Sequence, residues 1–375
     1  MEEVRSDSVH LVVTSPPYPM IEMWDNIFAD QNPLIKDTLD RGHGAEAFER
    51  MHGLLDPIWT ELYRVLIEGG IACINIGDAT RTIGGNFALY PNHMRVLKFL
   101  LDLGFTALPC ILWRKQTNAP NKFMGSGTLP AGAYVTLEHE YILILRKGPR
   151  REFKTETEKK RRRESSIFWE ERNRWYSDVW FDVKGTLQTL NANKTRSRSA
   201  AFPFEMVYRL INMYSVKEDT VLDPFSGTGT TTAACIASGR NSIGYEMDAG
   251  LKDAIFHSLN DIENVSNQYL LNRINRHLSF VKTRLADKIP IKYQSRHYGF
   301  QVIMSQETQI LLNEVIATRT NGTDSFEAVY ADKPRMGLMP EDHHRAADND
   351  RSRCESIERS MASDPKPDGR QLPLF

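Results

Sequence analysis

Two short stretches decide the fold of this 375-residue chain: Leu11-Val12-Val13-Thr14-Ser15-Pro16-Pro17-Tyr18, and Thr220-Val221-Leu222-Asp223-Pro224-Phe225-Ser226-Gly227-Thr228-Gly229-Thr230-Thr231. Each begins with a β-branched apolar run, which predicts a buried strand. Each then continues into a loop rich in Pro, Ser or Gly. Open α/β sheets bind their ligands in loops at the carboxyl ends of parallel strands. Both loops are therefore candidates for a ligand site at such an edge.

The surrounding sequence alternates between helical and strand-like patterns. This alternation predicts an α/β fold with a Rossmann-like, doubly wound and mostly parallel sheet. The Glu68-Gly69-Gly70 stretch predicts the end of the first long helix. The expected helices cover residues 45–66, 91–103, 203–214, 230–238 and 251–285, and the expected strands cover residues 71–76, 105–113, 141–145, 220–222 and 242–245.

Composition limits the class of protein. The chain has 47 Lys and Arg residues against 48 Asp and Glu residues, so its net charge is close to zero and does not indicate nucleic-acid binding. Only the local distribution of basic residues can indicate it. No apolar run is long enough to span a bilayer. Cys73, Cys110, Cys235 and Cys354 lack the spacing of a metal site or a disulfide framework. We therefore expect a reduced, cytoplasmic protein that holds no metal.

The second loop has the features of a site for S-adenosylmethionine. A phosphate-binding loop would carry lysine after its last glycine, but Thr230 follows Gly229. Asp223, at the strand end, favours a ligand with positive charge, such as the amino group and sulfonium of this cofactor. Glu246 follows the next strand, about 20 residues on, where a carboxylate accepts hydrogen bonds from ribose hydroxyls. A glycine-rich turn without a ligand is the alternative.

Taken together, the two loops resemble those of the amino-methylating DNA methyltransferases. Their order, with the target-amine motif first and the cofactor loop second, resembles the beta group of that family. The segment Ser199-Ala200-Ala201-Phe202-Pro203 is similar to the family segment that closes over the methionine end of the cofactor, although the usual histidine is absent; Pro203 could instead simply start a helix. The resemblance implies S-adenosylmethionine as cofactor, bound by Asp223, Pro224, Phe225, Ser226, Gly227, Thr228, Gly229, Thr230, Glu246, Phe202 and Pro203.

The first loop suits transfer of a methyl group to an exocyclic amine. Such an amine is a poor nucleophile and needs hydrogen-bond acceptors and tight positioning. Ser15 offers a hydroxyl oxygen, Pro16 offers a carbonyl, and Pro16 and Pro17 stiffen the loop. Tyr18 offers a face for a flipped base. Asp78 either lines the same pocket or caps a helix.

Serine rather than aspartate at position 15 resembles the cytosine-N4 enzymes, so we expect a site-specific cytosine-N4 DNA methyltransferase of a restriction-modification system. Adenine N6 is the alternative target. Further alternatives are an RNA or protein amine methyltransferase and a non-catalytic DNA-binding subunit. Pro109-Cys110 also brings to mind the nucleophile of cytosine-C5 enzymes, but its apolar surroundings predict a buried core cysteine.

We expect DNA contact mainly from residues 147–198, where basic and aromatic residues gather. The alternatives are that Lys159–Arg163 form a solvated helix face or loop, and that residues 251–335 supply the recognition. Trp180 and Phe181 are expected in the core. The expected partner is double-stranded DNA, with a cognate restriction endonuclease as functional partner; the resemblance also allows a homodimer, and Gln371–Phe375 resembles a peptide that docks on bacterial sliding clamps. The candidate DNA-binding residues are Lys159, Lys160, Arg161, Arg162, Arg163, Arg172, Arg174, Arg196 and Arg198.

These interpretations divide the chain into five parts. Residues 336–375 are polar and typical of disorder, while residues 293–332 predict a small α/β appendage. The parts are a target-amine half (1–146), a basic and aromatic segment (147–198), a cofactor-binding half (199–250), a C-terminal helical or α+β addition (251–335) and a tail (336–375).

Overall fold

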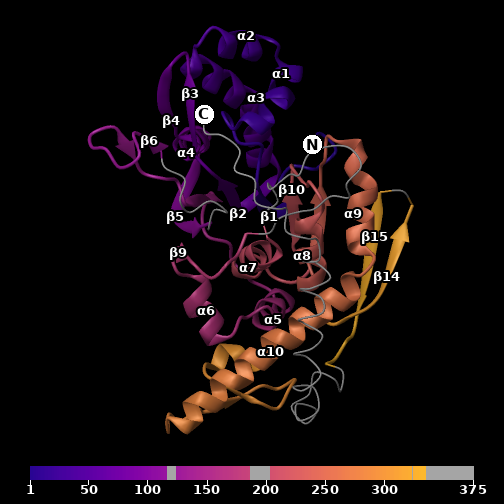
Figure 1. Ribbon diagram of the computed structural model, residues 1–375. Helices are drawn as coiled ribbons and strands as arrows, with labels where there is room; N and C mark the ends of the chain where they lie inside the picture. Colours follow the sequence, from indigo (N-terminus) through magenta and orange to yellow (C-terminus); the bar gives the residue numbers. More distant parts are fainter. Residues whose placement is uncertain (116–123, 186–202, 323, 335–375) are drawn as a thin grey trace, which may run out of the picture.

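A seven-stranded sheet forms the centre of the computed structural model, which describes residues 1–115, 124–185, 203–322 and 324–334 (Figure 1). The strand order is β11-β10-β1-β2-β8-β5-β9. The strands are β1 Val9–Thr14, β2 Leu66–Ile76, β5 Phe105–Arg114, β8 His139–Lys147, β9 Val179–Trp180, β10 Thr220–Asp223 and β11 Asn241–Gly244.

The sheet is mostly parallel, as the sequence predicts. Strands β11, β10, β1 and β2 pair in parallel, and β9 pairs in parallel with β5. Strand β8 is antiparallel to both of its neighbours, β2 and β5. All the other strands therefore end at one edge of the sheet, which we call the carboxyl edge; the opposite edge is the amino edge.

Helices cover both faces of the sheet, so its central strands β1, β2 and β10 are largely buried on both sides. Along β1, Val12 packs into one core and Leu11 and Val13 pack into the other, following the two-residue period of a strand. The first face carries η1 Glu22–Trp24, α1 Asp25–Gln31, α2 Leu34–Asp40, α3 Gly44–Val65 and α4 Asn92–Asp102, and the second face carries α6 Trp169–Trp175, α7 Phe204–Tyr214 and α8 Thr230–Ser238.

The C-terminal addition packs outside the second helical layer. The expected helix over residues 251–285 is broken at Asn260-Asp261, which lets Leu259 and Ile262 both enter a small core with Val315. The expected α/β appendage is wrong in detail, because its described residues form hairpins and no α-helix. The elements are η2 Ala249–Leu251, α9 Lys252–Leu259, α10 Ile262–Ala286, β12 Tyr293–Gln294, β13 Gln301–Val302, η3 Ser305–Gln309, β14 Val315–Asn321 and β15 Ser325–Tyr330.

Further small elements project from the two edges. The hairpins β3–β4 and β6–β7 follow strands that end at the carboxyl edge, and α5 follows β8 at the amino edge. No helix among the described residues is long and apolar enough to cross a membrane. These elements are β3 Ala79–Ile83, β4 Asn86–Tyr90, β6 Met124–Gly125, β7 Ala133–Tyr134 and α5 Glu156–Glu164.

Three local predictions were wrong. Glu68-Gly69-Gly70 lies inside β2, because the pairing with β1 shifts there and Gly69 takes φ +78. Cys110 is exposed, since the β5–β8 register breaks between Leu108 and Ile111. Phe181 is 65% exposed just beyond the edge strand β9, although Trp180 is 1% exposed as expected. The predicted tail, residues 336–375, lies outside the described residues.

Candidate active site

The two loops meet at the carboxyl edge, and Asp223 joins them. Its Oδ1 accepts a hydrogen bond from the Thr14 hydroxyl at 2.6 Å and from the Phe225 amide at 3.1 Å. Its Oδ2 accepts from the Thr231 hydroxyl at 2.6 Å. Burial of the carboxylate, 1% exposed, raises the pKa of Asp223 to about 6 despite these three donors. Asp223 therefore fixes the target-amine loop against the cofactor loop through neutral donors.

The cofactor loop turns tightly between β10 and α8. Gly227 and Gly229 have φ +55 and +81, values that side-chain-bearing residues rarely adopt. Glu246 is brought to this loop as expected: its Oε2 accepts a hydrogen bond from the Gly227 amide at 2.8 Å, and its Oε1 accepts from the Asp248 amide at 2.8 Å. Glu246 is exposed, so its remaining lone pairs face solvent beside the loop.

The target-amine loop lies in a network of polar side chains. The Tyr18 hydroxyl donates to Glu140 Oε2 at 2.9 Å and lies 3.1 Å from Ser15 Oγ. Asn75 Nδ2 lies 2.7 Å from both the Tyr18 oxygen and Glu140 Oε2, and 3.4 Å from Ser15 Oγ. Lys115 Nζ donates to Glu140 Oε1 at 2.8 Å. Glu140 therefore anchors the network.

This network fixes the direction of the hydrogen bond made by Ser15. Because the Tyr18 proton points to Glu140, the Ser15 hydroxyl donates to the Tyr18 oxygen. The oxygen of Ser15 then presents lone pairs to a ligand. Burial and the nearby Glu140 carboxylate raise the pKa of Tyr18 well above its usual value, which keeps the phenol protonated for this role.

The loop conformation depends on close packing at Gly77. A Cβ there would lie 3.0 Å from the Tyr18 ring and 3.2 Å from Glu140 Cγ. Pro16 is buried, while Pro17 and Tyr18 are half-buried. Asp78 caps a helix, because its Oδ1 accepts from the His93 amide at 3.1 Å in the first turn of α4.

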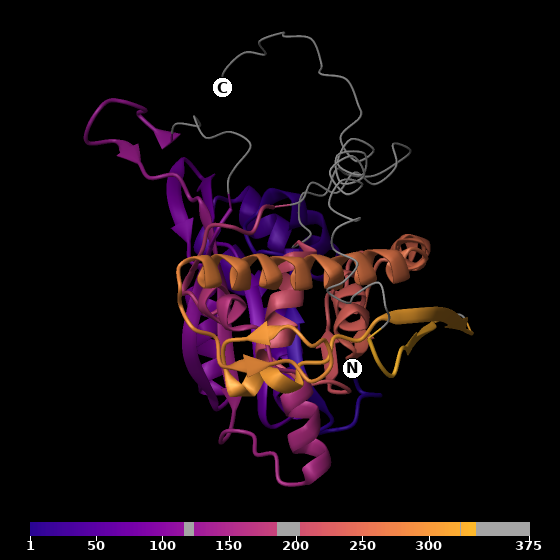
Figure 2. The ribbon, with the colours of Figure 1, turned by 90° about the horizontal axis from the view of Figure 1, so that it is seen from below.

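The basic residues of the predicted DNA-binding segment are not brought to this site. Lys159, Lys160, Arg161, Arg162 and Arg163 lie on α5 at the amino edge, and Figure 2 shows α5 and the β6–β7 hairpin at opposite ends of the molecule. The reason is that β8 runs antiparallel and delivers the chain to that edge.

The remaining predicted residues are divided between described and undescribed parts. Arg172 and Arg174 are exposed on α6, and Pro203 is the N-cap residue of α7. Phe202, Arg196 and Arg198 lie outside the described residues, as do Gln371–Phe375.

One group of three side chains in the described parts has the spacing of a metal site: Glu170, His277 and Glu307. Their contacts are already internal. His277 Nδ1 lies 2.9 Å from Glu170 and Nε2 lies 2.9 Å from the Gln301 carbonyl oxygen. Glu307 accepts hydrogen bonds from the backbone amides of Trp169 and Met304. The group ties α6 and η3 to α10.

Sequence reasoning missed Asn75, Glu140 and Lys115. Two of them carried a signal: Asn75 is polar within the apolar strand Ile71–Ile76, and Glu140 stands directly before the apolar run Tyr141–Leu145. A polar residue in a strand buried on both faces needs a partner. The sequence around Lys115 gave no such signal, because a lysine after a strand is common on protein surfaces.

The chain is similar in sequence to known DNA-modifying enzymes. Residues 9–257 match a protein family described as DNA methylase. The Type II methyltransferase M.MthZI of Methanothermobacter thermautotrophicus is 51% identical over 331 residues, covering 88% of this chain and 92% of its own. The Type II methyltransferase M.MjaI of Methanocaldococcus jannaschii is 51% identical over 266 residues, covering 68% of this chain and 86% of its own.

The fold is also similar to that of a solved structure. A Thermus thermophilus protein described as a putative DNA modification methylase, in complex with S-adenosyl-L-methionine, is 29% identical with a TM-score of 0.54. The similarity covers 70% of this chain and 89% of that one.

Proposed function

This chain belongs to the N6/N4 family of DNA methylases, and on that premise we propose that it transfers a methyl group from S-adenosylmethionine to N4 of a flipped cytosine in double-stranded DNA. The observation that carries the proposal is the Thr14–Asp223 hydrogen bond of 2.6 Å, which fixes the Ser15 loop against the glycine-rich loop. The acceptor for the target amine and the loop for the methyl donor are therefore parts of one rigid edge.

The residues of the second loop fit the cofactor. Gly227 and Gly229 allow close approach of the backbone, and the loop has no lysine for a phosphate. Glu246 is positioned and exposed to accept hydrogen bonds from ribose hydroxyls. Phe225, Ser226, Thr228 and Thr230 are half-buried along the same turn. When bound, S-adenosylmethionine supplies an electrophilic methyl group on its sulfonium.

Protein groups hold the amine in line for attack. The Ser15 oxygen accepts one amine hydrogen, and the Pro16 carbonyl is proposed to accept the other. Hydrogen bonding to both hydrogens favours a pyramidal nitrogen whose lone pair can attack. After transfer the nitrogen loses one proton to solvent. Glu140 and Asn75 keep the Ser15 oxygen in place throughout.

Cytosine is favoured over adenine by the residue that opens the target-amine motif. Serine at position 15 resembles the cytosine-N4 members of the family, whereas aspartate resembles the adenine-N6 members. Adenine N6 is the second candidate target, because its amine makes the same demand for two acceptors.

Nucleoside mass spectrometry tests this assignment. The protein is incubated with S-adenosylmethionine and unmethylated genomic DNA, with Ser15→Ala as the matched control. We expect N4-methylcytosine from the native chain and about a hundredfold less, or lower still, from the variant. N6-methyladenine would overturn the choice of base but keep the mechanism. Absence of any methylated nucleoside would overturn the proposed activity.

The biological setting is part of the same proposal. The two relatives at 51% identity are named Type II methyltransferases, so we propose that this chain protects DNA from a cognate restriction endonuclease. A homodimer and docking of Gln371–Phe375 on a sliding clamp stay proposals. Recovery of purified clamp by the chain with and without those five residues tests the second; equal recovery rejects it.

A further inference from the structure

A groove of about 1010 Å³ opens at the amino edge, away from the active-site loops. Its walls are α5, α6 and η3, and its base is the end of α7 with the segment Ser215–Val216 that leads into β10. This segment belongs to the amino edge because β10 begins at Thr220 and ends at Asp223 in the active site. The groove and the reaction site are thus at opposite ends of the same strands.

The lining of the groove is strongly basic. Lys159, Arg162, Arg163 and Arg172 line it, and Glu307 is the one acidic residue among the lining residues. Lys159 is paired with Glu156 at 2.9 Å, so the net positive charge comes from the three arginines. Glu307 is 2% exposed, and its carboxylate is turned inward to backbone amides. The surface offered to a ligand is therefore cationic.

The three guanidinium groups of the groove are available to bind an anion. Arg162 lies over the Phe153 ring at 4.9 Å, Arg172 lies over the Tyr176 ring at 5.5 Å, and Arg163 donates to the Gln309 amide oxygen at 3.2 Å. All three are exposed, and none has a carboxylate partner within the described residues.

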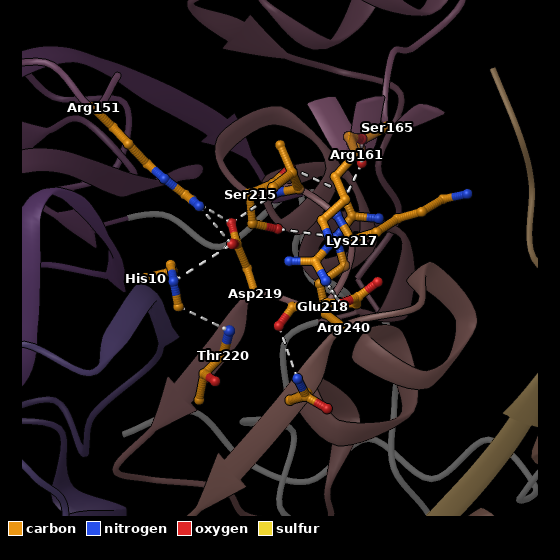
Figure 3. Close-up of polar contacts among 12 residues, drawn as sticks. His10, Arg151, Arg161, Ser165, Ser215, Lys217, Glu218, Asp219, Thr220 and Arg240 are labelled. Atoms are coloured by element: carbon orange, nitrogen blue, oxygen red, sulfur yellow. Dashed lines mark hydrogen bonds and ion pairs between the residues drawn. The ribbon is translucent and has the colours of Figure 1, made fainter. Parts of the chain in front are cut away.

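Neighbouring arginines behave differently. Arg151 makes a bidentate ion pair with Asp219 at 2.6 and 2.9 Å, and Arg161 pairs with Glu218 (Figure 3). Carboxylates therefore engage Arg151 and Arg161 but not the three arginines of the groove.

A smaller polar cavity lies beneath the groove and shares Ser165, Ser166 and Asn212 with it. It is also lined by two basic side chains, Lys217 and Arg240, and by the carboxylate of Glu164. Lys217 Nζ is buried without a hydrogen-bond partner within the described parts of the chain, and burial lowers its pKa to about 7. The Arg240 guanidinium donates to oxygens of Ser215 (Figure 3), and also to the Ser238 carbonyl; these are neutral acceptors.

We propose that this groove binds the sugar–phosphate backbone of nucleic acid outside the segment held at the active site. The planar fork of arginine matches phosphate oxygens, and such contacts carry no sequence information. A strand of six residues such as β1 separates the two edges by about 20 Å. The contacted phosphates therefore belong to a more distant part of the same DNA or to a second molecule. The proposal rests on the chain acting on DNA and not on which base it methylates.

The test is a charge reversal in the groove with a matched control elsewhere. Arg163→Glu with Arg172→Glu changes the net charge as much as Lys36→Glu with Lys98→Glu, whose lysines are exposed on α2 and α4. Binding of each protein to a long non-specific duplex is measured over a salt series. Methyl transfer from labelled S-adenosylmethionine is measured on a short duplex that carries only the target site and on long DNA.

The groove variant should lose about two units from the slope of log affinity against log salt, because each neutralised phosphate contributes about 0.9. It should methylate the short duplex with an unchanged kcat/KM and long DNA less efficiently at moderate salt. The control pair should keep the native slope. Arg163→Gln with Arg172→Gln repeats the test if the reversed protein does not fold.

Two outcomes would overturn the proposal. An unchanged salt slope would mean that the groove contacts no phosphates. If the groove variant lost as much kcat/KM on the short duplex as on long DNA, the groove would contact the target segment itself. If the native protein methylated neither substrate, the proposed function would be contradicted instead. The salt dependence of DNA binding would still test whether the groove contacts phosphates.

Discussion

Two buried aspartates, one at each edge of the sheet, are held in opposite ways. At the carboxyl edge Asp223 is held by two threonine hydroxyls and an amide, all neutral donors. At the amino edge Asp219 is also buried but pairs with the Arg151 guanidinium, with His10 nearby at 3.6 Å. Neutral donors position a carboxylate without cancelling its charge, whereas an arginine cancels it. Asp223 therefore keeps its negative charge beside the cofactor loop, whereas the charge of Asp219 is neutralised in an ion pair.

The largest expected effect comes from breaking the polar network around the Glu140 carboxylate. In the native protein both oxygens of Glu140 accept hydrogen bonds, from Asn75, Tyr18 and Lys115. In Glu140→Gln one of these oxygens is replaced by an NH₂ group, which donates instead of accepting. One donor loses its acceptor, and the Ser15 oxygen loses its fixed direction. We expect kcat for methyl transfer to fall by about 10²- to 10³-fold with an unchanged cofactor Kd, measured by calorimetry.

Glu138→Gln is the matched control for that change. Glu138 lies two residues away on the surface, paired with Arg114 at 2.9 Å and 42% exposed. Its loss should leave kcat within about twofold, because exposed pairs contribute little. Equal kinetics for the Glu140 and Glu138 variants would mean that the network does not position Ser15.

The next effect in size is on the pH dependence of stability. Burial raises the pKa of Asp223 from 3.8 to about 6, so the folded state holds its proton more tightly than the unfolded state. Protonation of Asp223 therefore contributes to the free energy of unfolding. This contribution, about 3 kcal/mol, is fully present below pH 3.8 and is lost as the pH rises through about 6. Asp223→Asn removes this dependence.

Urea unfolding between about pH 4 and pH 7 measures the difference. The free energy of unfolding of the native chain should decrease over this range relative to that of the Asn variant. If the difference in the free energy of unfolding between the two proteins stays constant with pH, burial does not raise the pKa of Asp223. The contrast with Asp219, which is paired with arginine, would then fail.

A smaller effect is expected from removing either of the two threonine hydroxyls that donate to Asp223, and the two variants should differ in kcat. Thr14→Val and Thr231→Val each remove one donor at 2.6 Å and should each lower stability by about 1–3 kcal/mol. Only Thr14 precedes the target-amine loop, so its variant should also lower kcat by about tenfold. Equal kcat values for the two variants, measured at saturating cofactor, would show that the Asp223 link does not position Ser15.

The fold could be predicted because its signals are local. Apolar runs and helical periodicity are patterns within one segment, and α3 at Gly44–Val65 matches the expected helix over residues 45–66 although the glycines expected to end it lie inside β2. The site was predictable only in its loops. Glu140 reaches Tyr18 from 122 residues away along an antiparallel strand, and no local pattern gives the direction of that strand. The same reversal of β8 takes the basic segment to the amino edge, which its composition could not indicate.

The smallest expected effect is at Cys110. A cytosine-C5 mechanism would need this thiol as a nucleophile against the flipped base. Cys110 is exposed at the register break of β5, and the Ser15 network runs through Asn75 and Glu140 without it. Cys110→Ala should therefore leave kcat, KM and the methylated product unchanged in the mass-spectrometric assay. Complete loss of methyl transfer in a folded Cys110→Ala protein would instead make the thiol part of the chemistry, and the acceptor role assigned to Ser15 would have to be withdrawn.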